Sequence, residues 1–121
     1  MARSFVKTTY PDLVALESAT LANTKIQLSA NPCDILYCNI ENPDATNKAY
    51  VQFFDAIATN VTVGTTKPKR SIVIPAGSTW DGLFTVPMSF GTALTIAATT
   101  TREGAVAPVT SLIVGCIDYL G

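Results

Sequence analysis

Histidine is absent from the 121 residues of this chain. Its absence removes the commonest general base, and with it the Ser–His and Cys–His pairs that activate nucleophiles in many enzymes. It also removes the commonest zinc ligand, and no Cys-x-x-Cys pair takes its place. We therefore expect a protein that is not an enzyme, with no catalytic residues, metal or cofactor.

Charge is also scarce, because Lys, Arg, Asp and Glu make up only 14% of the chain and the net charge is −1. Such a chain is not steered toward nucleic acid, and no stretch approaches the ~20 apolar residues of a membrane span. We expect neither nucleic acid nor membrane as a partner. A nearly neutral surface is poorly protected against association, so we expect a stable protein partner.

The three cysteines, Cys33, Cys38 and Cys116, form no obvious pair. In one regular strand Cys33 and Cys38 would point to opposite faces, roughly 17 Å apart, too far to bond. Cys38 and Cys116 lie in apolar segments that are candidates for neighbours in one sheet. We expect three reduced thiols, two of them packed as small hydrophobic side chains.

The first 20 residues have the weakest pattern. Residues 1–9 are polar and mixed, which is typical of a loose arm. Pro11-Asp12 opens either a short helix through residue 18 or an extended segment. The start lacks the apolar run of a secretion signal, so we expect synthesis in a cytoplasm. We assign residues 1–20 to an N-terminal arm or short helix and residues 21–121 to one domain.

From residue 21 onward, short apolar runs alternate with turn signals every 8–12 residues. The predicted strands are residues 25–29, 35–40, 49–56, 61–64, 70–74, 79–86, 93–100 and 111–120. Hardly any segment suits a crossover helix, which argues against a parallel sheet. The pattern predicts an all-β protein, an antiparallel β-sandwich that is jelly-roll-like with about eight short strands and an N-terminal arm.

The same pattern predicts finer details. Residues 35–40 and 49–56 should form a hairpin, and the second of these should be a central strand because it has aromatic side chains on both faces. Gly82 marks a candidate bulge. In the strand at 93–100, the outward-facing side chains should be Thr95, Ala97 and Thr99.

Two groups of residues are candidates for contacts. Lys67, Lys69 and Arg70 form the one basic cluster, which is either an anion contact or a solvated turn that deters edge pairing. Trp80 beside Asp81 suits a sugar-stacking pair, but we favour a half-buried tryptophan at a strand end or subunit interface. The best-shielded carboxylates, Asp55 and Asp81, are not placed together as a glycosidase needs.

Three blocks of sequence, taken together, resemble small proteins encoded by tailed bacteriophages and prophages. They are NPDATNKAYVQFFDA at 42–56, VTVGTTKPKRSIVIPAGS at 61–78 and LTIAATTTREGAVAP at 94–108. The resemblance covers residues 35–120, whereas the first 30 residues depart from the pattern. It implies a virion-associated β-sandwich of the head decoration, or cement, type, with no catalytic residues to carry over.

Such a protein would be made in the host cytoplasm and would bind the major capsid protein on the outer surface of the head as a homo-oligomer, with a trimer favoured. The alternative is a receptor-binding adhesin domain of the phage tail or fibre. The candidate partner contacts are Arg3, Phe5, Lys7, Tyr10, Lys67, Lys69, Arg70 and Trp80. The first four belong to the arm, which would order on the capsid or on a neighbouring subunit.

Overall fold

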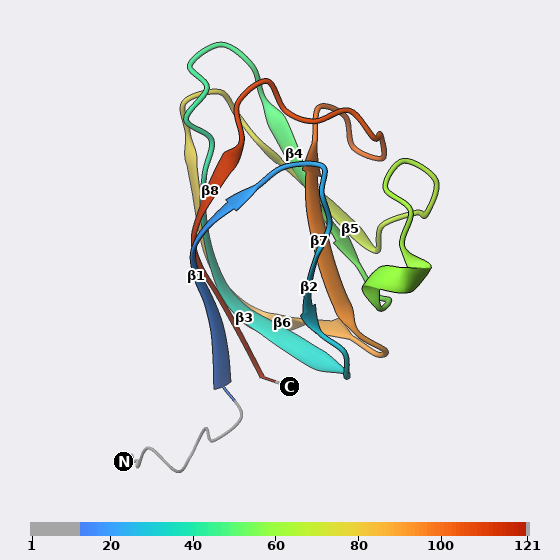
Figure 1. Ribbon diagram of the computed structural model, residues 1–121. Helices are drawn as coiled ribbons and strands as arrows, with labels where there is room; N and C mark the ends of the chain where they lie inside the picture. The colour runs from blue at the N-terminus through green and yellow to red at the C-terminus, as the bar shows by residue number, and fades with distance from the viewer. Residues whose placement is uncertain (1–12, 121) are drawn as a thin grey trace.

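The computed structural model describes residues 13–120, which form two four-stranded sheets packed face to face (Figure 1). The strands are β1 (Leu13–Leu21), β2 (Ile26–Ser29), β3 (Cys33–Glu41), β4 (Ala49–Phe54), β5 (Arg70–Ile74), β6 (Thr79–Phe90), β7 (Leu94–Thr99) and β8 (Leu112–Leu120), with a short 3₁₀ helix, η2 (Ala58–Asn60), between β4 and β5.

The strand order identifies the architecture. One sheet has the order β1-β8-β3-β6, and the other has the order β2-β7-β4-β5, with every neighbouring pair antiparallel. This is the arrangement of a jelly roll, in which two Greek keys wind into a double sheet. The prediction of an antiparallel, jelly-roll-like β-sandwich is therefore confirmed.

The core lies between the two sheets and is built from inward-facing alternate residues. Phe53 of β4 and Phe90 of β6 meet there with ring centroids 6.4 Å apart, and Ile35, Ile96 and Ile117 are completely buried beside them. β4 is a central strand covered on both faces, as predicted. The alternation of apolar side chains therefore sets which face of each strand packs inward.

The cysteines bear out one expectation and correct another. Cys33 and Cys38 are buried free thiols, and Cys116 lies on β8 next to the β3 strand that carries Cys38. However, Cys33 and Cys38 both face the core, instead of opposite faces. The pairing of β3 is irregular between Ile35 and Tyr37, and this bulge reverses the alternation.

The N-terminal assignment also needs correction. Residues 13–20, which we placed in an arm or short helix, form most of β1 and pair with β8 from Leu13 opposite Leu120 to Leu21 opposite Leu112. The extended alternative is the right one, since β8 offers a free edge whose backbone groups β1 satisfies. Strand β1 therefore belongs to the sandwich.

Three further details differ from the sequence-based expectation. β3 and β4 form no hairpin, because they lie in different sheets, and the connection between them crosses from one sheet to the other. The segment 61–64 forms no strand; a turn covers residues 63–65, with Gly64 at φ +94°. The irregularity of β6 lies between Leu83 and Met88, beyond Gly82.

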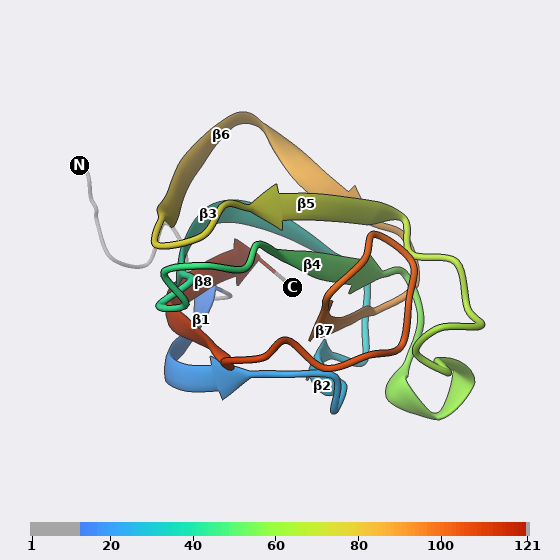
Figure 2. The same ribbon diagram turned by 90° about the horizontal axis from the view of Figure 1, so that it is seen from above.

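The outer face of β7 is covered, so Thr95, Ala97 and Thr99 are buried instead of exposed. The loops at 55–69 and 100–111 lie over this sheet. Ala97 packs with Phe54 of β4 and Val61 of the first loop in a small second core. Residues far apart in the sequence thus cover this outer face (Figure 2).

Candidate functional site

Strand β6 bows away from its sheet partner near its middle. Leu83 stands opposite Tyr37 and Met88 stands opposite Ile35, so residues 84–87 of β6 face Leu36 alone on β3. The strand bows outward in an arch, with β5 on its inner side (Figure 2). β5 and β6 are the edge strands of their sheets on the same side of the sandwich, which we call the open side. Pro87 suits this position because it has no N–H to offer a further strand.

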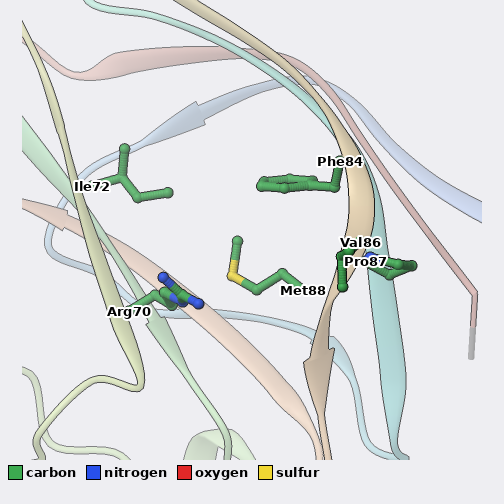
Figure 3. Close-up of a pocket in the computed structure, with 6 residues that line it drawn as sticks. All are labelled: Arg70, Ile72, Phe84, Val86, Pro87 and Met88. Carbon is green, nitrogen blue, oxygen red and sulfur yellow. The ribbon is translucent and has the colours of Figure 1, made fainter.

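A cavity of about 290 Å³ lies between the arch and β5 (Figure 3). Its lining residues are Arg70 and Ile72 of β5 and Phe84, Val86, Pro87 and Met88 of β6. All are apolar except Arg70, whose guanidinium reaches the cavity from the β5 side (Figure 3). The cavity therefore combines an apolar wall with a single cationic group.

Strand β6 carries two strongly exposed apolar side chains: Val86 lines the cavity, and Leu83 stands opposite Tyr37 on the outer face of the sheet. Leu83 is 79% exposed and Val86 is 82% exposed. Residues 82–90 contain no charged side chain, so the edge lacks the lysines with which many proteins protect a free edge strand. An uncharged apolar edge of this kind is a candidate surface for another protein.

The basic cluster is divided between two roles. The Lys69 ammonium donates a hydrogen bond to the Ser89 carbonyl, lies 3.9 Å from the Asp55 carboxylate and lies 5.3 Å from the centroid of the Phe90 ring. Lys69 thus links the start of β5 to the end of β6, which is a structural role.

Lys67 and Arg70 remain available for a partner. Both are exposed, and within residues 13–120 neither forms an ion pair. Arg70 stands opposite the buried Phe53 in the β5–β4 pairing, and this inward register places it beside the cavity. Arg70 gives the open side its positive charge, and Lys67 lies in the loop that leads into β5.

Trp80 is half-buried and stabilises the same strand. It stands opposite the buried Ile40, and its ring meets the Phe84 ring edge to face at 5.8 Å. A Cβ added to Gly82 would come within 3.2 Å of the indole, so the ring covers that glycine. This agrees with the half-buried interpretation that we favoured.

The carboxylates do not form a catalytic pair. Asp81 accepts a hydrogen bond from the Tyr37 hydroxyl, and this bond raises the tyrosine pKa above its usual value. Asp55 instead binds the turn after β6, where Gly91 donates its backbone N–H at 3.0 Å. The two carboxylates thus serve separate hydrogen-bonded sites.

The structure leaves part of the predicted site untested. Arg3, Phe5, Lys7 and Tyr10 lie outside the described residues. The arch residues Leu83, Val86 and Met88 were not selected from the sequence, although the uncharged run at 82–90 interrupted by Pro87 is a signal for an exposed edge.

Two absences apply to the described part of the chain. Between residues 13 and 120, no three side chains of the His, Cys, Asp or Glu type gather as metal ligands. No helix in this range is long and apolar enough to cross a membrane. Comparison of the chain with family models, curated proteins and solved structures found no match.

Proposed function

We propose that this chain is a structural protein of a tailed-bacteriophage virion, which binds the major capsid protein on the outer face of the head as a homo-oligomer. The observation that carries the proposal is the open side, where an uncharged edge with Leu83 and Val86 exposed borders an apolar cavity. Exposed apolar patches of this kind are typical of protein interaction sites.

The resemblance to phage proteins supports the same proposal. Its three blocks, residues 42–56, 61–78 and 94–108, contain β4, β5, β7 and most of the two covering loops. These blocks supply three of the four strands of the β2-β7-β4-β5 sheet, all but β2, and one of the two edge strands of the open side. The similar segments are therefore framework, on which a binding surface is displayed.

A protein of this kind acts by mass action. If it binds only the assembled shell, each bound copy stabilises the shell by RT ln(1 + [L]/Kd), about 2.7 kcal/mol when its free concentration is 100 times Kd. A symmetric oligomer adds effective concentration, so that weak single contacts give firm binding. No chemical step is required of any residue.

Gold labelling of this protein on intact virions tests the proposal. Label over the whole head is the expected result. Label confined to the tail end would overturn the head location in favour of the adhesin, and unlabelled virions would overturn the virion assignment.

A matched pair of variants tests the surface. Leu83→Lys with Val86→Lys places two charges on the exposed β6 edge strand, one of them at the cavity, and should abolish head labelling. Val106→Lys with Val109→Lys is the control, because these valines are also exposed, at 66% and 75%, but lie in the loop at 100–111. Equal labelling by both variants would contradict a role for the open side.

A further inference from the structure

The two sheets of the sandwich carry opposite charge. Strands β1, β8, β3 and β6 contain five carboxylates and no lysine or arginine, and the carboxylates are Glu17, Asp34, Glu41, Asp81 and Asp118. Strands β2, β7, β4 and β5 contain one cation, Arg70, and no carboxylate. The charges of the strands are therefore divided between the two sheets.

Four of these carboxylates lie on the outer face of their sheet. Asp118 stands opposite Tyr37, and its neighbours Ile117 and Tyr119 are buried in the core. Asp81 stands opposite Asn39, and its neighbour Trp80 is half-buried against the core. Glu41 stands opposite Ile113, a side chain that is 41% exposed on this face, and Asp34 stands opposite Leu120. We call this outer surface of the β1-β8-β3-β6 sheet the acidic face.

The open side has the complementary character. Arg70 lines the cavity together with the exposed Val86, and Lys67 lies three residues earlier, in the loop that leads into β5. Neither cation has an ion pair within the described residues. The acidic face presents Glu41 and Asp81 beside the exposed Ile113. The two surfaces are therefore complementary in charge, and each has an exposed apolar side chain that a contact between them would bury.

We propose that the open side of one copy binds the acidic face of the next copy. This inference rests on the self-association within the proposed function and specifies how it is achieved. Because the two surfaces differ, the contact is head-to-tail, and repeating it around a closing rotation gives a ring of three or more copies. Ion pairs of Lys67 and Arg70 with Glu41 and Asp81 of the next copy would fix how the two surfaces align. The contact would also bury the apolar side chains of Val86 and Ile113, which water otherwise covers.

The alternative is a symmetric dimer in which the open sides of two copies contact each other. Repulsion between their positive charges opposes this dimer. Around a two-fold axis Arg70 would approach Arg70 of the other copy, and like charges at an interface are costly. The arch also leaves the line of the sheet at residues 84–87, and Pro87 has no N–H for a continuous ladder across the edge.

Charge exchange tests the proposal, with molar mass in solution measured by light scattering after gel filtration. The wild-type chain should give three or more times 12.8 kDa, and the mass should fall as salt is raised. Lys67→Glu with Arg70→Glu should give a monomer at the same concentration. Glu41→Lys with Asp81→Lys should also give a monomer, with self-association weakened at least 100-fold in each case.

The variant with all four substitutions exchanges the charges on both surfaces and should recover the wild-type mass. Glu103→Lys is the matched control, since this exposed carboxylate lies in the covering loop, and it should leave the mass unchanged. Thermal unfolding of every variant establishes that each is folded before its mass is interpreted.

A monomeric wild-type chain would overturn the inference, as would a two-substitution variant that keeps the full mass or a folded four-substitution variant that stays monomeric. These outcomes are independent of virion labelling. A charge-exchangeable ring that labels no virion would uphold this contact and overturn the proposed function.

Discussion

Asp55 accepts a hydrogen bond at 2.8 Å from the backbone N–H of Thr92, so the residue after β4 holds the turn between β6 and β7. The same carboxylate accepts from Gly91 at 3.0 Å and from Ala93 at 3.2 Å. One side chain thus satisfies three backbone donors that no strand pairs, and it joins the two sheets at one end of the open side.

Removing this carboxylate should destabilise the protein. Asp55→Ala leaves the three donors without their charged acceptor, and hydrogen bonds to charged groups contribute about 1.5–3 kcal/mol, so we expect a loss of roughly 2 kcal/mol. Urea unfolding at pH 7 measures it. Asp44→Ala is the control for a carboxylate that caps an exposed loop, and it should cost less.

The same residue should make stability depend on pH. Burial raises the pKa of Asp55, but the N–H groups of Thr92, Gly91 and Ala93 and the Lys69 ammonium outweigh burial and hold the pKa below its usual value. Because the folded pKa is depressed, the stabilisation is complete above the unfolded pKa of about 3.9 and is lost as pH falls through the folded pKa.

Urea unfolding at pH 7, 4 and 3 checks this sign. The stability difference between the wild type and Asp55→Asn should be largest at pH 7 and should shrink as the pH falls below about 4. A difference that stays constant from pH 7 to pH 3 would contradict the account.

Two glycines provide a test of close packing against backbone strain. Gly64 has φ +94°, and a Cβ there would lie 2.5 Å from the Ala105 Cβ of the other covering loop. Gly77 has φ +67° but open space around it, with Ala45 Cα at 3.9 Å. Gly77→Ala should therefore cost about 1–2 kcal/mol from the left-handed backbone alone.

Gly64→Ala should cost clearly more, because it adds a steric clash to the same strain. Thermal unfolding of both variants gives the comparison. An equal loss of stability in the two variants would contradict this, because it would mean that the covering loops move apart in Gly64→Ala with no loss of free energy.

Gln52 holds the covering loop at 100–111 on the sheet. Its buried amide donates to the Thr99 hydroxyl at 2.6 Å and to the Gly104 carbonyl at 3.0 Å. Gln52→Leu should lower stability by about 1–3 kcal/mol, since it leaves these acceptors unsatisfied. The loop should open locally, and trypsin should cleave after Arg102 faster than in the wild type.

Gln27→Leu is the matched control for this loop. Its side chain is exposed and accepts from the Ala58 backbone N–H at 2.7 Å, at the other covering loop. It should not speed cleavage after Arg102, and a similar acceleration in both variants would indicate a global effect.

The thiol of Cys38 should be inert in the folded protein. Burial raises its pKa to about 12, so almost no thiolate exists at pH 8. A disulfide reagent at pH 8 should leave Cys38 unlabelled until denaturant is added. Cys38→Ala should lower the denatured thiol count by one and leave the native count unchanged, and a lower native count would contradict the prediction.

The pattern of apolar side chains predicted most of the strands of this protein. β2, β5, β7 and β8 lie within a residue or two of their predicted bounds, because alternation and turn residues act between neighbours in the chain. The lack of charge at 82–90 is also a property of the sequence, whereas the sheet order is what makes β6 an edge strand.

Only the tertiary structure decided which strands share a sheet and which segments pack against each strand. The placement of β3 and β4 in different sheets, the arch of β6 over β5 and the burial of Thr95 and Thr99 all depend on contacts between distant parts of the chain. Such contacts follow from how the two sheets close on each other. That closure turned a scattered set of carboxylates into one face and brought Arg70 to the apolar cavity.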